Sequence, residues 1–323
     1  MQSIYFLRIL PMESDNFLLL FHPQNFNMST KRSVLITGCS DGGLGSFLAL
    51  AFHRAGWRVF ASARDLSKLK VVEAAGIETV QLDTLSGESI AACVSRVAEL
   101  AGGSLDCLVN NAGAGYTMPL ADMEIAKAKE LFDLNVWSVI TVTRAFLGLL
   151  LKAAPGALIV INTSGSSQPA GMLPFAGAYN ASKAAAAAIA ETFRIELEAF
   201  GIRTVNLLTG SVKSNFLGNR LAPPKLPPNS IYNIAKEEAE RVMSGEDVAG
   251  GSDPTQWADQ VVADLSKKKP PYWIWRGKFS TLVWLAGFLP VGALDSISKS
   301  VSGMGLMEKK VKEAKKAGKV KAT

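Results

Sequence analysis

Short apolar runs alternate with helical segments along most of the chain, and this alternation constrains the fold more than any other feature of the sequence. We expect strands at 34–37, 58–61, 79–82, 105–110, 157–162 and 203–208. Helical patterns separate them at 44–55, 66–75, 88–100, 126–150 and 179–200. Connections of this length join parallel strands by right-handed crossovers, with helices on both faces of the sheet. The sequence therefore predicts an α/β fold built on a doubly wound parallel sheet.

The regular alternation ends shortly after the sixth expected strand. The stretch 210–251 includes the proline-rich "LAPPKLPPNS", which is typical of a substrate lobe inserted after a late strand. We expect residues 31–270 to form a single catalytic domain that includes this lobe. Residues 1–30 would be a poorly ordered leader, and residues 271–323 would form an aromatic, apolar and lysine-rich C-terminal extension.

The composition argues against several functional classes. Of the 323 residues, 48% are hydrophobic and 19% are charged, and the formal net charge is +6. Much of the positive charge lies in the final stretch "MEKKVKEAKKAGKVKAT", so it does not indicate nucleic-acid binding. Three scattered cysteines and two histidines predict neither a disulfide framework nor a metal site. The mean hydropathy of +0.20 instead suggests contact with lipid or with a partner.

A glycine-rich turn, "TGCSDGGLG", follows the first expected strand and precedes the first expected helix. Gly38 would end the strand sharply, Gly43 would let the backbone approach a pyrophosphate, and Gly45 would let the helix pack closely on the sheet. Unpaired N–H groups at the helix N-terminus would then bind the phosphates of a dinucleotide. A plain turn between a strand and a helix is the alternative. The predicted contacts also include two neighbours in the turn, Ser40 and Leu44.

The end of the second strand favours one form of the dinucleotide. Chains that bind a free ribose diol usually place an acid there, whereas this chain has Ala63 followed by Arg64. A guanidinium suits a phosphate, so we expect NADPH rather than NADH, with a surface arginine as the alternative. Asp83 would accept a hydrogen bond from the adenine amino group. The "NNAG" loop would lie near the adenine and ribose through Asn111, Ala112 and Gly113.

The motif "YNASK" places Tyr179 and Lys183 on one face of a helix. A free phenol titrates near pH 10 and a neighbouring ammonium lowers its pKa, so Tyr179 would become a usable proton donor or acceptor. Ser166, thirteen residues earlier, would hydrogen-bond the same substrate oxygen, with Ser164 as its rival. Asn135 would hold a water for proton relay to Lys183, or would be a satisfied core amide.

Together these motifs resemble the short-chain dehydrogenase/reductase family over residues 33–215. The resemblance implies a Rossmann fold and hydride transfer between a nicotinamide and a carbonyl carbon. It also implies a catalytic tetrad of Asn135, Ser166, Tyr179 and Lys183. Three residues after the sixth strand would contact the cofactor, namely Gly210, Val212 and Ser214. The chain departs from the family pattern in a longer glycine turn, in a longer segment before the serine, and in a threonine where proline usually follows the sixth strand.

The glycine turn, the alanine-rich helix and the late "YWIWRGK" look like one branch of this family. That branch contains fungal NADPH-dependent 1-acyldihydroxyacetone-phosphate reductases and is close to the 17β-hydroxysteroid dehydrogenase-like group. The resemblance implies an NADPH-dependent reductase of a lipid-like ketone, with 1-acyldihydroxyacetone phosphate as the first candidate. The alternatives are a reductase or dehydrogenase of a steroid or secondary-metabolite ketone, and a cofactor-binding membrane scaffold without turnover.

The C-terminal extension predicts peripheral contact with a membrane. Its apolar run is too short to cross a bilayer, but its tryptophans favour the interface and the following lysines would attract anionic lipid. Alternatively, the aromatic side chains wall the substrate pocket. We expect a location at the cytosolic face of the endoplasmic reticulum or of a lipid droplet, or in the cytoplasm. The alanine run at 184–188 would pack against a second subunit in a homo-oligomer, or against its own sheet.

Overall fold

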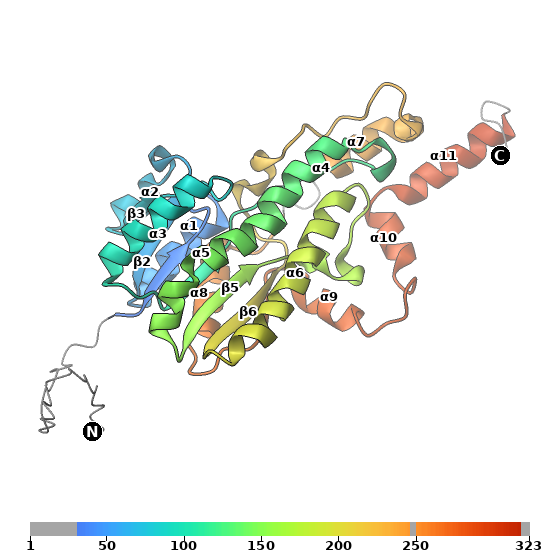
Figure 1. Ribbon diagram of the computed structural model, residues 1–323. Helices are drawn as coiled ribbons and strands as arrows, with labels where there is room; N and C mark the ends of the chain where they lie inside the picture. The colour runs from blue at the N-terminus through green and yellow to red at the C-terminus, as the bar shows by residue number, and fades with distance from the viewer. Residues whose placement is uncertain (1–30, 246–249, 318–323) are drawn as a thin grey trace, which may run out of the picture. The chain divides into compact units, whose positions relative to one another are not determined.

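Seven short strands form one parallel β-sheet in the computed structural model (Figure 1). The structure describes residues 31–245 and 250–317, so the predicted leader lies outside the described residues. The described residues from Arg32 onward form one compact unit. The strands lie in the order β3-β2-β1-β4-β5-β6-β7. Their bounds are β1 Ser33–Ile36, β2 Arg58–Ala63, β3 Glu78–Gln81, β4 Cys107–Asn110, β5 Ala157–Asn162, β6 Ile202–Thr209 and β7 Trp273–Arg276.

The strand order reverses at β1. β2 and β3 lie on one side of β1, whereas β4 to β7 lie on the other. In parallel registers, Leu35 of β1 pairs with Phe60 of β2 and with Leu108 of β4. The carboxyl ends of these strands therefore meet at one edge, where ligands of such sheets bind. The glycine turn and the "NNAG" loop both leave the sheet at this edge.

Helices cover both faces of the sheet (Figure 1). On one face lie α1 (Leu44–Arg54), α2 (Lys70–Ala74) and α8 (Pro254–Leu265). On the other face lie α3 (Gly87–Ala101), α5 (Ser138–Ala153) and α6 (Gly177–Glu198). All residues of β1, β4 and β5 are buried, as strands covered on both faces require. The predicted α/β fold with a doubly wound parallel sheet is confirmed.

The alanine-rich part of α6 packs on its own sheet. Ala186 and Ala190 belong to the buried core between α6 and the strands. Small side chains let a helix approach a sheet closely, so this contact accounts for part of the alanine run.

Two elements near the end of the sheet were not predicted. α8 buries Trp257 and Val261 against the sheet, and β7 pairs in parallel with β6. The four residues "WIWR" of β7 are too few to show an alternating pattern and read instead as an aromatic surface motif. β7 lies within the predicted C-terminal extension, so the sheet continues beyond the predicted domain boundary at residue 270.

The helix expected at 126–150 has three parts. α4 (Ile125–Phe132) runs into a π-helical turn, Asp133–Trp137, and α5 follows. Within the described part of the chain, this stretch is long and apolar enough to cross a membrane, but half of its most apolar window is buried inside the protein. Phe146 of α5 lies in the core with the side chains of β4 and β5. Packing against the sheet accounts for its apolar character.

The lobe after β6 and the last helices share a small core. The lobe contains α7 (Lys236–Ser244), and the described chain ends with α9 (Ser280–Ala286), α10 (Asp295–Val301) and α11 (Met304–Lys316). Ala235, Ala239 and Met243 of the lobe pack with Met307 of α11. The predicted lobe and the predicted extension are therefore joined by a common apolar contact.

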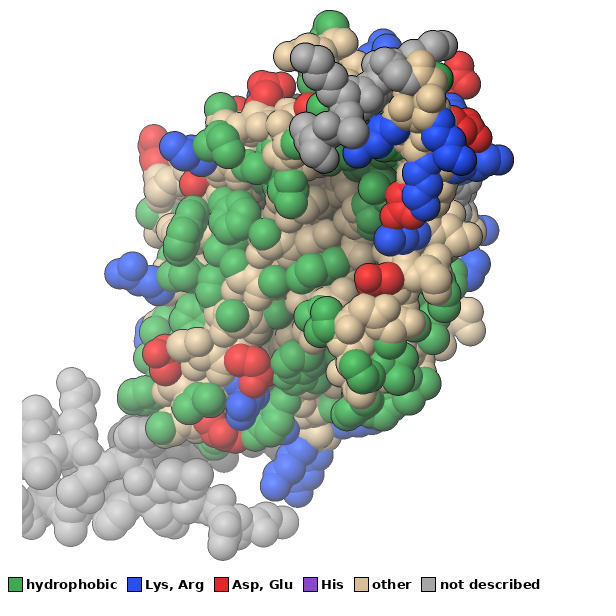
Figure 2. Space-filling model, turned by 90° about the vertical axis from the view of Figure 1, so that its right-hand side faces the viewer, with side chains coloured by type: hydrophobic (Ala, Val, Ile, Leu, Met, Phe, Trp, Pro, Cys, Tyr) green, Lys and Arg blue, Asp and Glu red, His purple; other side chains and the backbone are tan. Residues whose placement is uncertain are grey.

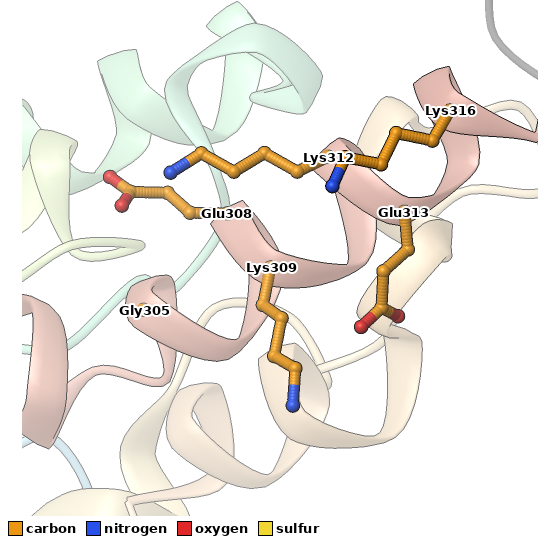
Figure 3. Close-up of a pocket in the computed structure, with 6 residues that line it drawn as sticks. All are labelled: Gly305, Glu308, Lys309, Lys312, Glu313 and Lys316. Atoms are coloured by element: carbon orange, nitrogen blue, oxygen red, sulfur yellow. The ribbon is translucent and has the colours of Figure 1, made fainter.

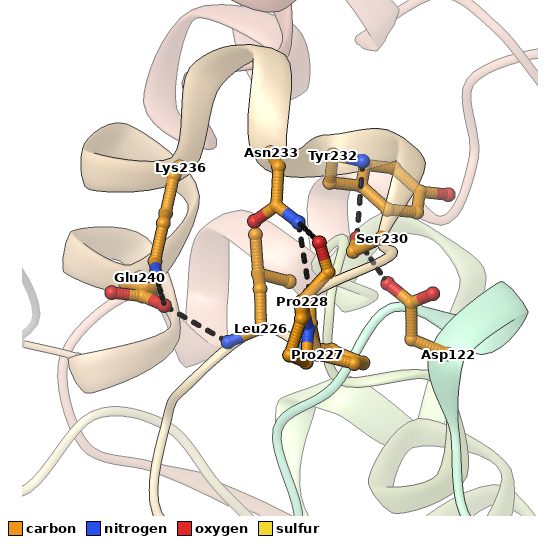
Figure 4. A network of polar contacts seen from close by, with 9 residues as sticks. All are labelled: Asp122, Leu226, Pro227, Pro228, Ser230, Tyr232, Asn233, Lys236 and Glu240. Carbon is orange, nitrogen blue, oxygen red and sulfur yellow. Dashed lines mark hydrogen bonds and ion pairs between the residues drawn. The ribbon is translucent and has the colours of Figure 1, made fainter.

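Polar contacts hold the proline-rich segment of the lobe (Figure 4). Ser230 Oγ donates a hydrogen bond to Asp122 Oδ2 at 2.5 Å. Asn233 Nδ2 donates to the carbonyls of Pro227 at 2.8 Å and Pro228 at 2.9 Å. Prolines have no N–H to donate, so side chains supply the bonds that fix this backbone. The lobe is thereby tied to the segment that precedes α4.

Candidate active site

The glycine turn after β1 has the geometry of an anion-binding site. Gly38 has a φ of +72°, and a Cβ added there would lie 2.9 Å from the Cα of Ala112. A Cβ on Gly45 would lie 2.4 Å from the carbonyl oxygen of Gly38. No described side chain caps α1 at its N-cap, Gly43, and its first turn holds no acid. The first N–H groups of α1 can therefore face an anion, and the turn fits the pyrophosphate of a dinucleotide.

A further glycine, Gly42, was missed by the sequence reasoning. Its φ is +74°, and a Cβ there would lie 2.3 Å from Nδ2 of Asn215. The backbone N–H of Asn215 donates to the carbonyl of Gly42 at 3.0 Å, and its Nδ2 donates to the carbonyl of Asp41 at 3.1 Å. The loop after β6 therefore closes onto the glycine turn. The double glycine in "DGG" was the available signal for this close approach.

The three cofactor contacts predicted after β6 lie in this loop. A Cβ on Gly210 would lie 2.3 Å from the carbonyl oxygen of Lys278, so a larger residue would displace the backbone. Val212 packs against the core of the sheet. Ser214 Oγ accepts the N–H of Phe216 at 3.4 Å and so begins a short 3-10 helix. These residues shape the loop, and their contacts with a dinucleotide remain predictions.

Four other predicted contacts surround the carboxyl ends of β1, β2 and β3. The carbonyl of Ser40 closes the glycine turn, and Leu44 packs against the core. Arg64 is exposed directly after β2 and forms no ion pair with any described residue. Asp83 Oδ1 accepts the N–H of Leu85 at 3.0 Å, which leaves its second carboxylate oxygen for another donor. Arg64 and Asp83 follow β2 and β3, and the contacts of all four residues with a dinucleotide remain predictions.

The "NNAG" loop after β4 is fixed beside the glycine turn. Asn111 Nδ2 donates to the carbonyls of Thr37 at 2.9 Å and Gly38 at 3.1 Å. Thr37 Oγ1 accepts the N–H groups of Asn111 and Ala112, both at 2.9 Å. A Cβ on Gly113 would lie 3.6 Å from Lys183 Nζ. The loop thus joins the turn to the buried lysine.

Asn162, at the end of β5, links four parts of the site. Its carbonyl accepts a hydrogen bond from Lys183 Nζ at 3.0 Å. Its Nδ2 donates to Asn111 Oδ1 at 2.9 Å, and its Oδ1 accepts from Thr209 Oγ1 at 2.6 Å. Sequence reasoning missed this residue, because an asparagine at a strand end is more often a turn residue than a buried residue with several hydrogen-bond partners.

Lys183 is a buried cation on α6. Its Nζ lies 5.9 Å from the ring centroid of Tyr179, as the shared helix face predicts. It forms no salt bridge with any carboxylate in the described ranges. Burial lowers the pKa of Lys183 to about 8, because the ammonium has lost most of its water. At pH 7 the charged form is therefore still favoured by about ten to one.

The side chain of Ser164 lowers the pKa of the Tyr179 phenol through hydrogen bonding, which opposes the effect of burial. This favours the rival residue, Ser164, and the choice between Ser164 and Ser166 stays a prediction. A 3-10 turn, Gly165–Ser167, follows Ser164, and the N–H of Ser166 donates to Ser164 Oγ at 3.1 Å. The segment between β5 and α6 is longer than the family pattern, so the spacing of thirteen residues does not by itself select Ser166. Ser166 instead orients Ser164 through its backbone.

Burial, rather than the neighbouring cation, sets the protonation of the phenol. It raises the pKa of Tyr179 to about 12, and the hydrogen bond with Ser164 opposes the rise. The expected lowering by Lys183 is absent because that ammonium is directed to the carbonyl of Asn162. Desolvation disfavours the charged form of both groups. The phenol is therefore protonated at neutral pH and ready to donate.

Asn135 lies in the π-helical turn and is a satisfied core amide. Its Oδ1 accepts the N–H of Ala114, and its Nδ2 donates to the carbonyl of Ala114 and to Ser182 Oγ, all at 3.0 Å. These contacts match the core-amide alternative. The side chain anchors the loop after β4 to α6, next to Lys183.

An apolar wall flanks the phenol. The ring of Phe216 lies 5.6 Å from the ring of Tyr179, measured between centroids. A Cβ on Gly115 would lie 3.2 Å from the ring of Phe216, so the loops after β4 and β6 meet there. Tyr116 and Met118 belong to the same buried cluster as Tyr179. Such a wall suits a substrate with an apolar part.

One charged side chain, Arg220, contacts this wall. Its Cγ lies 4.0 Å from the Cβ position of Gly115, and its Nη2 donates to the carbonyl of Ser244. Its Nε is buried without a hydrogen-bond partner. No carboxylate within 31–245 and 250–317 pairs with it, and burial lowers its pKa. A partly buried guanidinium without a counter-ion is suited to an anionic ligand.

The site brings together two hydroxyl donors, a cation and a helix N-terminus. Ser164 and Tyr179 can donate hydrogen bonds to one oxygen atom, and Lys183 lies behind the phenol. Such an arrangement can polarise a carbonyl group and deliver a proton to its oxygen.

Comparisons with known proteins agree on one family. Residues 32–224 match the family model described as short chain dehydrogenase. A short-chain dehydrogenase/reductase of Pestalotiopsis microspora is 46% identical over 290 residues, which cover 89% of this chain and 100% of that protein. An NADPH-dependent 1-acyldihydroxyacetone phosphate reductase of Schizosaccharomyces pombe is 34% identical over 275 residues, which cover 82% and 92%. The crystal structure of a short-chain dehydrogenase from Streptomyces avermitilis matches with a TM-score of 0.69 at 24% identity, over 87% of this chain and 98% of that one, which shows a shared fold.

The buried lysine predicts a pH-dependent stability. The folded pKa of Lys183, about 8, lies below its ordinary value of 10.5. Between these two values the unfolded chain therefore binds more protons than the folded protein, so the free energy of unfolding rises with pH. The contribution of Lys183 to stability is complete above the unfolded pKa and is lost as the pH falls through 8. Relative to Lys183→Met, the free energy of unfolding of the wild-type protein should rise by about 2 kcal/mol from about pH 7.5 to about pH 9.5. Urea denaturation at both pH values measures this difference, and a difference independent of pH would contradict it.

Proposed function

The chain belongs to the short-chain dehydrogenase family, and from that premise we propose that it is an NADPH-dependent reductase of a lipid-like ketone. The leading candidate substrate is 1-acyldihydroxyacetone phosphate. The proposal depends on one observation, which is that Ser164, Tyr179 and Lys183 lie together at the carboxyl edge of the sheet, the edge at which the uncapped α1 also begins. Oxidoreductase chemistry follows from the family, whereas the form of the cofactor and the substrate are inferred from particular side chains.

Each group of the site has a role in carbonyl reduction. The substrate oxygen would lie between Ser164 Oγ and the Tyr179 hydroxyl, which donate hydrogen bonds as negative charge develops on it. Tyr179 would give its proton to that oxygen. Lys183, whose ammonium donates to the carbonyl of Asn162, would hold the start of α6, and with it the phenol, in place. A nicotinamide dinucleotide would supply the hydride when bound. A phenol that burial keeps protonated at neutral pH suits the reducing direction.

Arg64 supports NADPH as the cofactor. It is exposed directly after β2 with Ala63 before it, so no acid at this position repels a phosphate. A guanidinium presents paired donors to phosphate oxygens. The relative from Schizosaccharomyces pombe is described as NADPH-dependent.

Arg220 supports a substrate with an anionic group. Its guanidinium has no carboxylate partner in the described chain and lies on the wall that Phe216 and Gly115 form beside the phenol. A ketone with both a phosphate and an acyl chain would use the cation and the apolar wall together. The relative from Schizosaccharomyces pombe is named for such a substrate.

A neutral steroid or secondary-metabolite ketone is the second candidate. The cluster that contains Tyr116, Met118 and Leu221 offers a largely apolar surface. Arg220 also donates a hydrogen bond to the carbonyl of Ser244, which partly satisfies the guanidinium without a ligand.

Turnover of a ketone panel tests the substrate. With NADPH, the protein should reduce 1-acyldihydroxyacetone phosphate in preference to neutral polycyclic ketones. Arg220→Leu should raise the Michaelis constant for the phosphorylated ketone by about tenfold or more, because a charge-assisted hydrogen bond is lost. Arg194→Leu, which removes a partly buried arginine paired with Glu191 on α6, is the control and should have little effect.

Other results of this panel select other functions. Preferred turnover of a neutral ketone would select the second candidate. Cofactor binding without turnover of any ketone would indicate a non-catalytic scaffold.

The two serines provide a test of the site. Ser164→Ala should lower the turnover number by about 10²–10³-fold, because a hydrogen-bond donor to the developing negative charge is lost. Ser166→Ala should change it by no more than a few-fold, because only the backbone of Ser166 contacts Ser164. Tyr179→Phe should abolish turnover. Steady-state kinetics with NADPH in excess measures all three, and a larger loss at Ser166 than at Ser164 would reverse the assignment.

Cofactor choice is tested at Arg64. Arg64→Ala should raise the Michaelis constant for NADPH by about ten- to a hundredfold and leave that for NADH nearly unchanged, because only NADPH carries the additional phosphate. Arg96→Ala, at an exposed arginine of α3 paired with Glu99, is the matched control. Equal effects on both cofactors would refute the phosphate contact.

A further inference from the structure

Helix α9 turns its large apolar side chains away from the protein. Its small residues Ser280 and Ala286 are buried, whereas Leu282 and Leu285 are 60% and 52% exposed. A helix that packs on a core normally has the opposite arrangement, with large apolar residues inside. The outer side of α9 is therefore available to an apolar partner that is not part of the described chain.

The exposed apolar surface continues beyond α9. Phe288 is 74% exposed, and its ring lies edge to face with that of Trp284, with 5.5 Å between the centroids. We define the apolar face as Leu282, Trp284, Leu285, Phe288, Leu289 and Val291. Figure 2 views the side of the molecule that carries α9, α10 and α11, and hydrophobic side chains occupy much of it. Clustered exposed apolar residues of this kind mark a contact site.

Positive charge follows the apolar face along the chain. α11 packs beside α10 and carries five lysines and two glutamates. One of these glutamates, Glu308, is paired with Lys299 of α10 at 2.7 Å. Figure 3 shows Lys312 and Lys316 leaning back along α11, whereas Lys309 projects to one side. Tryptophan and aliphatic side chains beside lysines are typical of segments that lie in the interface of an anionic bilayer.

Helix α9 adjoins the loop that holds Ser164 through its inner side. The side chain of Val283 lies 3.7 Å from the Cβ position of Gly165 and 3.1 Å from that of Gly171. A Cβ on Gly171 would lie 2.2 Å from the carbonyl oxygen of Gly165, so this loop is folded tightly beneath α9. The inner side of α9 thus touches the serine loop while its outer side is exposed.

We infer that the apolar face docks on an anionic phospholipid bilayer, with the lysines of α11 facing its headgroups. A second copy of this chain is the competing occupant of the face. It would bring another lysine-rich α11 close to the first, and like charges at an interface repel. An anionic bilayer instead offers apolar chains and negative charge together. Entry of a lipid ketone from the bilayer past α9 rests on the proposed function, whereas the docking itself does not.

Vesicle flotation tests the docking. The full-length protein should float with vesicles of phosphatidylcholine and phosphatidylserine. The double variant Trp284→Ser/Phe288→Ser should bind these vesicles about tenfold or more weakly, because it lacks two exposed aromatic side chains that the bilayer would bury. The triple variant Lys309→Glu/Lys312→Glu/Lys316→Glu should lose binding to the anionic vesicles and behave like wild type with pure phosphatidylcholine.

The control is Trp137→Ser, which removes a tryptophan that is 55% exposed on the π-helical turn. It should bind vesicles as the wild type does, and circular dichroism should show that every variant is folded. Equal binding by the wild type and the double variant would overturn the inference. So would the absence of vesicle binding together with a dimer, seen by sedimentation, that the double variant dissociates.

Flotation and turnover measurements distinguish a failure of the proposed docking from a failure of the proposed function. Turnover of a water-soluble ketone should be the same in the double variant and in the wild type, because the substitutions lie outside the reacting groups. Flotation without turnover of any ketone would count against the proposed function only. Turnover without flotation would count against the docking only.

Discussion

The hydrogen bond from the Lys183 ammonium to the carbonyl of Asn162 is the contact on which the site depends. A buried ammonium without a partner would be strongly disfavoured, so the carbonyl replaces part of its lost water. Asn162 can present this carbonyl because its own side chain is fixed by Asn111 on one side and by Thr209 on the other. One amide residue therefore aligns the ends of β4, β5 and β6 with α6, and the position of the phenol follows from the position of α6.

Burial shifts the pKa values of Tyr179 and Lys183 in opposite directions, because it disfavours the charged form of each group. It holds the phenol in its neutral form and brings the pKa of the lysine down towards the physiological range. A surface pair at the same helical spacing would do neither, because water would solvate both charges. The apolar wall beside Tyr179 is thus part of the acid-base chemistry as well as a surface for a substrate.

Much of the fold could be predicted from the sequence, because strands covered on both faces have short, uniformly apolar sequences and the glycine turn has few other uses. Tyr179 and Lys183 could also be paired, since helical spacing places both on one face. The choice between Ser164 and Ser166 could not be made from the sequence, because both lie at a single 3-10 turn whose geometry the spacing does not reveal. Asn162, Asn215 and Arg220 were missed because their importance comes from contacts with residues far away in the chain. The pKa of Tyr179 was predicted in the wrong direction because spacing reveals a neighbouring charge but does not reveal the extent of burial.

The late strand β7 has a consequence for any shortened form of the protein. It pairs with β6 along four residues and is the outermost strand of the sheet. A truncation before Trp273 would leave the N–H and C=O groups on that side of β6 without partners, and an uncovered, strongly apolar edge is a template for aggregation. The aromatic character of "WIWR" is compatible with this protective position, because an outermost strand can cover its neighbour while its own side chains remain partly exposed.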